Sequence, residues 1–423
     1  MSSLKSYLDD VSLAIFYKDG GKIASMISIS SPELTTRSQF PVPTQYDLQG
    51  INNEKLMIVL QTYLKIAKVI VHEQDIVQVF ELELELLQCL NRCAEKEDVW
   101  IIPPLINTTK ELRKLYNAKL SILSKQDLQK QHDNNYDNNN NNNNNDKPSD
   151  LEKMANMISK SFQICLNDRN LDQNKSKRIA VFFFIGELFK IYSNLQKYDM
   201  ARSIEKTLTS LRDGLPTMES INKSHAVTYL YFSGSIACSQ GNFEEARSRL
   251  LRAFLFCGKS FKSQQESILL LLIPINFFTN KKFPNDKLWE NYPISKSVYY
   301  KIFKSIKKGD LKSFDNEFKK IELILLKKQV YIVMMKLRLF VILSLLKRIW
   351  KILGQNPHLP ISAVQLALEY SSSHKPVNEG NFSITLDAAE STLSTLIASG
   401  KIKGYISHGN RVAVLSKNEP FPN

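Results

Sequence analysis

With 423 residues, 43% hydrophobic and 10% aromatic, the chain has the composition of a globular protein and room for roughly two to three domains. These values exclude a chain that is disordered throughout, because disordered chains are depleted in aromatic residues. The net charge of +14 is uneven: residues 296–351 hold fifteen Lys and Arg against four Asp and Glu, a local net of +11. This concentration predicts an anionic partner, either nucleic acid or a very acidic polypeptide.

Residues 1–125 are predicted to form an N-terminal helical region. A short helix is expected at Leu4–Phe16, and apolar residues at helical spacing over 56–70 predict a second helix. A more acidic helix is predicted over 75–94. The N-terminus shows no basic segment followed by an apolar run, so we expect the protein to stay inside the cell.

A polar tract at 126–150 follows this region. It contains eight consecutive asparagines at 138–145. Its small apolar surface cannot offset the entropy lost on ordering, so the tract is predicted to be a disordered insertion. Asparagine runs can also drive aggregation or condensation. A tolerated loop expansion is the simpler interpretation, because long surface loops cost little.

Residues 151–350 are predicted to form TPR-like pairs of helices. An aromatic-x-x-Ala step at 198–201 recurs 45 residues later at 243–246. Small residues near the second step, such as Gly234 and Ala253, allow two antiparallel helices to approach closely, as in a tetratricopeptide repeat. Degenerate repeats of this kind stack into a solenoid. The predicted fold class is therefore mostly α, a TPR-like solenoid ending in a winged helix.

Two apolar stretches in this region are predicted to be buried core helices. The stretch at 268–273 is only six residues long, and the stretch at 330–346 is interrupted by Lys336 and Arg338. A membrane-spanning helix needs about 20 mostly apolar residues. No membrane contact is therefore expected.

Residues 351–423 are predicted to form the winged helix. Pro360 suits the first turn of a helix over 361–370, and a second amphipathic helix over 387–399 is ended by Gly400. Two strands, 401–407 and 411–416, flank a turn at Gly409 and Asn410. Helices followed by one hairpin are typical of a winged helix.

The sequence lacks the residue patterns of an enzyme or a metal site. Cys89 and Cys93 lie one helical turn apart, but no further Cys or His pair completes four ligands, so all five cysteines are expected to be core residues. The Gly-Lys-Ser at 258–260 lacks the earlier glycine of a phosphate-binding loop, where Ala253 stands. The six histidines are scattered. We expect no catalysis, no metal and no cofactor.

The basic segment is the predicted nucleic-acid-binding surface. Lys301, Lys304 and Lys308 recur at i, i+3 and i+7 and so share one helical face. Lysines neutralise phosphates without choosing a sequence. The alternative is a solvated surface that serves solubility. The full predicted set is Lys301, Lys304, Lys307, Lys308, Lys312, Lys319, Lys320, Lys327, Lys328, Lys401, Lys403, Arg411 and Lys417.

The wing contributes the last four of these cations. The helix over 387–399, which would read bases in a winged helix, has two acids and no Lys or Arg, so it is poorly equipped for sequence-specific contacts. We therefore expect the wing to continue the lysine face along a phosphate backbone. Apolar hairpin residues are expected to divide between the core and a partner. The predicted partner contacts are Tyr405, Ile406, Val412 and Val414.

Several motifs resemble the PCI domain, the repeat-plus-winged-helix module shared by the proteasome lid, the signalosome and translation initiation factor three. The C-terminal stretches GKIKGYISH (400–408) and VLSKNEPFP (414–422) look like the subfamily that contains the mRNA-export subunit Thp-one and the signalosome-associated subunit twelve. The unit at 234–257, then LLIP (271–274) and LWENY (288–292), match that subfamily in the same order. The resemblance covers 182–422. Asn280 stands where the family usually has glycine.

The resemblance implies a non-catalytic scaffold in a nuclear complex that couples transcription to mRNA processing, in splicing, elongation or export. Its implied partners are a second PCI subunit, a small acidic disordered subunit of the Sem/Dss type, and RNA or DNA bound largely without sequence choice. The implied location is the nucleus, with the cytoplasm as a second location. The alternative is a structural subunit of a signalosome-like complex in cullin deneddylation control, without nucleic-acid binding.

Overall fold

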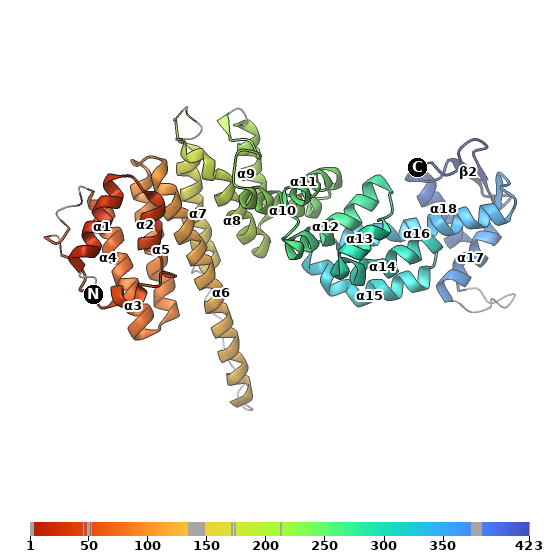
Figure 1. Ribbon diagram of the computed structural model, residues 1–423. Coiled ribbons are helices and arrows are strands. Elements are labelled where there is room, and N and C mark those ends of the chain that lie inside the picture. The colour runs from red at the N-terminus through yellow and green to blue at the C-terminus, as the bar shows by residue number, and fades with distance from the viewer. Residues whose placement is uncertain are drawn as a thin grey trace. The chain divides into compact units, whose positions relative to one another are not determined.

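The chain folds into two compact units, residues 1–232 and 233–423. The computed structural model describes residues 4–44, 46–48, 51, 53–133, 149–170, 172, 175–211, 214–373 and 383–422. In α6 (Ile102–Asp133), side chains are described only as far as residue 124. Both units are mainly helical (Figure 1). Their boundary falls inside residues 151–350, the predicted region of TPR-like helix pairs.

Unit 1 is a row of packed helices (Figure 1). They are α1 (Leu4–Phe16), α2 (Gly20–Met26), α3 (Leu34–Ser38), α4 (Glu54–Lys68), a π-helical turn (Val69–Glu73), α5 (Ile76–Ala94), a 3-10 turn (Val99–Ile101), α6 (Ile102–Asp133), α7 (Asp150–Leu166), a 3-10 turn (Lys177–Ala180), α8 (Val181–Asn194), α9 (Tyr198–Ser210) and the first part of α10 (Lys223–Ser239).

The helix ends in unit 1 follow the local chemistry of the sequence. The predicted helix at Leu4–Phe16 is confirmed, and α5 begins after Asp75, whose side chain accepts hydrogen bonds from the next turn. Ser149 and Glu152 form a capping box at the start of α7. α6 continues to Asp133 and so enters the 126–150 tract that was predicted to be disordered. Residues 134–148 of that tract lie outside the described residues.

A buried polar cluster holds the first forty residues, where helical periodicity is weak, against α4 and α6. Arg37 Nη1 donates to the Met26 carbonyl (2.5 Å) and to Tyr63 Oη (3.0 Å). Tyr63 Oη donates in turn to the Ser28 carbonyl, and Ser28 Oγ donates to the buried carboxylate of Glu111 (2.5 Å). These contacts join residues far apart in sequence, and this explains why periodicity predicted only α1 in this segment.

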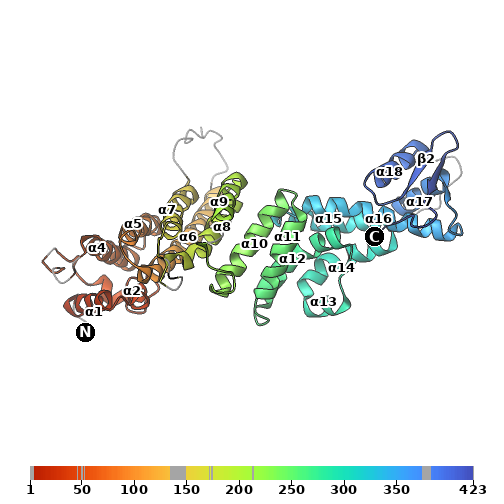
Figure 2. The same cartoon turned by 90° about the horizontal axis from the view of Figure 1, so that it is seen from above.

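Unit 2 combines repeat helices with a small α/β module (Figure 2). After the end of α10 come α11 (Phe243–Phe256), α12 (Lys262–Asn280), α13 (Asp286–Asn291), α14 (Pro293–Lys308), α15 (Leu311–Lys327), α16 (Tyr331–Ile352), β1 (His358–Pro360), α17 (Ile361–Ser373), α18 (Leu386–Ala398), β2 (Gly404–Ser407) and β3 (Val412–Leu415). The predicted close approach of α10 and α11 is observed, since a Cβ on Gly234 would lie only 2.8 Å from Leu250 Cγ.

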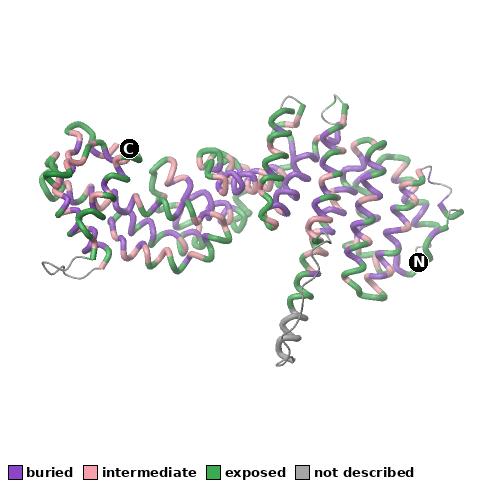
Figure 3. The backbone as a smooth tube through the Cα atoms, turned by 180° about the vertical axis from the view of Figure 1, so that it is seen from behind, coloured by how far each residue is buried: buried purple, intermediate pink, exposed green. Residues whose placement is uncertain are grey.

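The 268–273 stretch is buried in α12, as predicted. α16 buries only one face of the 330–346 stretch, since Ile332 and Met335 are 58% and 54% exposed. Figure 3 shows buried positions running along the helices of unit 2. Within the described part of the chain, no helix is both long and apolar enough to span a membrane. α12 continues through Pro274, which has no N–H to donate to the Leu270 carbonyl one turn earlier. The fully buried Tyr299 of α14 donates its hydroxyl to that carbonyl instead, at 2.6 Å.

The winged helix consists of α17, α18 and a three-stranded antiparallel sheet in the order β1-β3-β2. The predicted helices and hairpin are confirmed. β1, a three-residue strand before α17 that pairs with β3, was not predicted from the sequence. β3 is therefore the central strand, and the sheet edges among the described residues are β1 and β2.

One turn of the repeat helices anchors the winged helix. Gly309 ends α14 with φ +71°, and a Cβ there would lie 2.7 Å from the Leu345 backbone nitrogen. Ser371 of α17 donates its hydroxyl to the Gly309 carbonyl (2.8 Å) and accepts from the Leu311 amide (2.9 Å). Lys312 Nζ also donates to the Ser373 carbonyl (2.8 Å). This network fixes α17 against the start of α15.

The Pro274 and Tyr299 arrangement generates a stability prediction. Replacing Tyr299 by Phe leaves the Leu270 carbonyl buried without its donor, so the free energy of unfolding is expected to fall by about 1–3 kcal/mol. Urea or thermal unfolding of the full chain measures this. Tyr300→Phe is the matched control, because Tyr300 is 40% exposed on the same helix. Equal stability of both variants would contradict this role for the hydroxyl.

Candidate partner and nucleic-acid interface

The predicted lysine face is partly exposed on α14 and α15 of unit 2. Six of its members are exposed and make no ion pair with any described residue: Lys301, Lys304, Lys307, Lys308, Lys319 and Lys327. Lys320 is exposed but pairs with Glu317 at 2.6 Å. Lys312 is half-buried and bonded to α17, and burial lowers the pKa of Lys328. The exposed members are therefore the ones free to meet an anion.

Sequence reasoning did not single out the C-terminal end of α16, which extends this positive surface. Arg348 is exposed and its Nη2 donates to the Lys307 carbonyl at 3.3 Å. Lys347 lies close enough to Lys281 and Lys351 for their charges, after burial, to lower its pKa. The residues Lys347, Arg348 and Lys351 thus connect α14 with the end of α12. Periodicity within one helix could not reveal this grouping, because Lys281 follows the end of α12, far from α16 in sequence.

The four wing cations do not behave alike. Lys401 lies 4.5 Å above the Phe340 ring, and burial followed by the nearby Lys281 charge lowers its pKa. Lys401 therefore lies near the cations at the end of α12 and on α16. Lys403 pairs with Glu419 at 2.6 Å, while Lys417 is exposed.

Arg411 is held by two acids of α18. Its Nη1 donates to Asp387 and to Glu390, each at 2.7 Å, and Glu390 also meets His408 at 2.8 Å. The hydrogen bond to Asp387 is the main reason that the pKa of Arg411 is raised. A phosphate could bind this guanidinium only by displacing a carboxylate. The two acids of α18 therefore interact with side chains of the hairpin.

The outer face of the sheet collects three of the four predicted partner residues. The register places Tyr405 opposite Val414, and Val414 opposite His358 of β1. Val412 stands on the same face, opposite Pro360. Tyr405 is 64% exposed, and the two valines are half-buried. Ile406 belongs to the other face, because it pairs with the fully buried Ala413.

A groove of about 660 Å³ lies between α16, α17 and the turn after α14. Ile352 (83% exposed), Leu366 (51%) and Tyr370 (61%) provide apolar lining. Lys308 and Arg348 line the same groove, so its rim is cationic. Large exposed apolar side chains beside unpaired cations are typical of a docking surface for an acidic, partly apolar segment.

The described residues hold no group of three or more His, Cys, Asp or Glu placed to bind a metal ion. All five cysteines are buried free thiols. Burial raises the pKa of Cys93 to about 12, so its thiol stays protonated at neutral pH. Gly258 follows the last turn of α11, consistent with a helix end.

The PCI domain family matches residues 318–417, which include most of α15, α16 and the winged helix. This match defines the chain as a PCI-domain protein. A protein named CSN12 homolog from Debaryomyces hansenii is 36% identical over 99% of this chain and 98% of its own length. Another CSN12 homolog, from Schizosaccharomyces pombe, is 27% identical over 99% of this chain and 97% of its own length.

A Saccharomyces cerevisiae protein named COP9 signalosome complex subunit 12 is 30% identical over 82% of this chain and 80% of its own length. The chain belongs to the CSN12 family of PCI-domain proteins. The fold class and family that the sequence motifs indicated are therefore confirmed.

Proposed function

We propose that this chain is a scaffold subunit of a nuclear complex that couples transcription to mRNA processing, in splicing, elongation or export. In that role it binds a second PCI subunit, a small acidic Sem/Dss-type subunit, and RNA or DNA. The observation that carries the proposal is the exposed cationic surface of unit 2, formed by the C-terminal ends of α14 and α16 beside the apolar groove. No catalytic step is part of the proposal.

Nucleic acid in this proposal is bound through its backbone. Lys304, Lys307 and Lys308 are exposed without ion pairs among the described residues, so their charges are available to phosphates. The helix that reads bases in many winged helices is α18, and its Asp387 and Glu390 are engaged by Arg411. Binding is therefore expected to depend on charge and to show little sequence preference.

Charge reversal on α14 tests this binding. For the variant Lys304→Glu with Lys308→Glu, affinity for single-stranded RNA should fall similarly for different sequences. The slope of log affinity against log salt should become shallower by about 0.7 for each phosphate that the chain no longer neutralises. Fluorescence anisotropy in a salt series measures both effects. Lys259→Glu with Lys262→Glu is the control, because both lysines are exposed elsewhere in unit 2. Unchanged binding by the α14 variant would rule out this surface.

The small acidic subunit is proposed to occupy the groove between α16 and α17. Its carboxylates would meet Arg348, and its apolar side chains would cover Ile352, Leu366 and Tyr370. Covering these three exposed side chains removes apolar surface from water, which favours binding by about 25 cal/mol per Å². A second copy of this chain is disfavoured as the occupant, because its net charge of +14 opposes the cationic rim.

Acidic substitutions in the groove test this assignment. The variant Ile352→Asp with Leu366→Asp is expected to lose the small acidic subunit on purification from cells, because two carboxylates replace the apolar contacts. Folding should be retained, since both side chains are largely exposed. Leu251→Asp with Leu255→Asp on α11 is the matched control, with 41% and 72% exposure. Normal recovery of the acidic subunit with the groove variant would overturn the assignment.

The second PCI subunit is proposed to dock on the outer face of the winged-helix sheet. Tyr405, Val412 and Val414 form an apolar stripe there, and the β2 edge beside them is open among the described residues. An aromatic side chain next to an unpaired strand edge favours a partner that adds main-chain hydrogen bonds and buries the ring.

A second candidate function is supported by the names of relatives, because the Saccharomyces cerevisiae protein is named as a signalosome subunit. In this role the chain is a structural subunit in cullin deneddylation control and binds no nucleic acid. Depletion from cells distinguishes the two functions. Unspliced or unexported transcripts should accumulate if the mRNA-processing proposal holds. Accumulation of neddylated cullin with normal transcripts would contradict it and favour the second function.

A further inference from the structure

Unit 1 contains a polar groove between α5 and α7 that plays no part in the function proposed for unit 2. Its volume is about 770 Å³, within the range of sites that hold a small ligand or a short peptide. Gln88 and Asn91 line it from α5, and Gln163 and Asn167 line it from α7. On each helix the two amide side chains stand three or four positions apart and so share one face.

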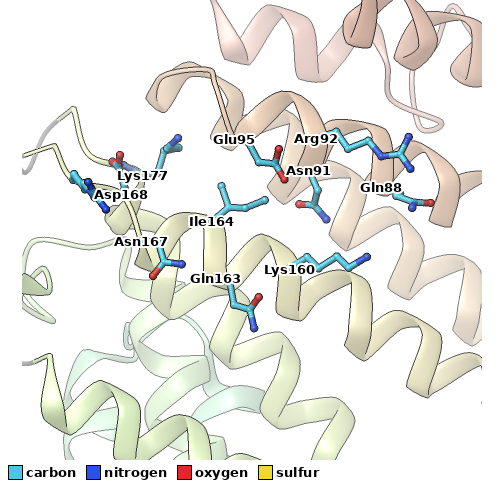
Figure 4. Close-up of a pocket in the computed structure, with 11 residues that line it drawn as sticks. Gln88, Asn91, Arg92, Glu95, Lys160, Gln163, Ile164, Asn167, Asp168 and Lys177 are labelled. Atoms are coloured by element: carbon cyan, nitrogen blue, oxygen red, sulfur yellow. The ribbon is translucent and has the colours of Figure 1, made fainter.

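Asn91 is a fixed polar group between the two helices. It is only 3% exposed and points from α5 toward α7 (Figure 4). Its Nδ2 donates to the Met157 carbonyl at 3.1 Å, and its Oδ1 accepts from Ser161 Oγ at 2.7 Å. These bonds hold the Asn91 amide in one orientation. Gln163 and Asn167 are exposed along the same groove and are available to a ligand.

The charge left free in this groove is positive. Arg92, Lys160 and Arg169 are exposed and make no ion pair with described residues. The acids that line the groove have partners: Glu95 lies 3.9 Å from a lysine of α4. Asp168 accepts hydrogen bonds of 2.7 and 2.9 Å from the backbone and hydroxyl of the turn before α8. An anionic ligand therefore matches the groove.

We infer that this groove binds an extended, acidic segment of a partner protein. An amide side chain both donates and accepts, as a peptide main chain does, so Gln163 and Asn167 can pair with the ligand backbone. The three free cations then select carboxylate side chains. Single-stranded nucleic acid fits less well, because proteins bind it by stacking bases on aromatic rings and none of the described residues lining the groove is aromatic.

The test uses the full chain and a fluorescein-labelled peptide of alternating Glu and Gly with a photo-crosslinking residue at its centre. Cross-links should map to α5 and α7. The variant Arg92→Ala with Lys160→Ala should weaken this binding by roughly fivefold to tenfold, as expected for the loss of two charge pairs. Gln163→Ala with Asn167→Ala should also weaken it, although it leaves the net charge unchanged.

Lys65→Ala with Lys114→Ala is the control, because both lysines are exposed in unit 1 and neither lines the groove. Circular dichroism checks that each variant folds. Cross-links only outside α5 and α7, or peptide binding that is insensitive to the amide variant, would overturn the inference. Equally tight binding of a Lys and Gly peptide would also overturn it, as would tighter binding of an RNA oligomer to the same groove. These outcomes concern unit 1 alone and leave the proposed function of unit 2 untouched.

Discussion

The Ser371 hydroxyl links the winged helix of unit 2 to its repeat helices, and the candidate surfaces depend on this link. Ser371 donates to the Gly309 carbonyl and accepts from the Leu311 amide. The turn between α14 and α15 can supply these groups because Gly309 adopts a positive φ and lies against the α16 backbone. With α17 held at this turn, the groove with Ile352 and Leu366 lies next to Lys308 and Arg348. The cationic surface of α14 and α16 therefore lies next to the apolar surface of the groove.

Much of the fold could be predicted because its signals are local. Helical spacing and the tetratricopeptide pattern around Gly234 indicated the repeat helices, and the Gly409 and Asn410 turn indicated the hairpin. β1 could not be predicted, because three residues carry no period and the strand exists only through its pairing with β3. α2 and α3 depend on the Arg37 and Tyr63 network, which joins residues distant in sequence.

The candidate interface was predictable in charge but not in arrangement. The excess of lysines in 296–351 is visible in the sequence, and Lys304 and Lys308 are exposed on α14. Which cations are free depends on tertiary contacts that a sequence does not display. Arg411 is engaged by two acids of α18, whereas Lys281, which follows α12, lies near Lys401. The amide groove of unit 1 was likewise not predicted, since α5 and α7 are separated by the whole of α6.

The central claim is that the chain acts by holding other subunits on exposed surfaces and not by a reaction in a pocket. The most direct test is the mass and composition of the assembly that contains this protein, purified from its own cells and measured by native mass spectrometry. The account predicts an assembly with a second PCI-domain protein and a small acidic protein. Recovery of the chain as a lone, stable monomer would contradict it.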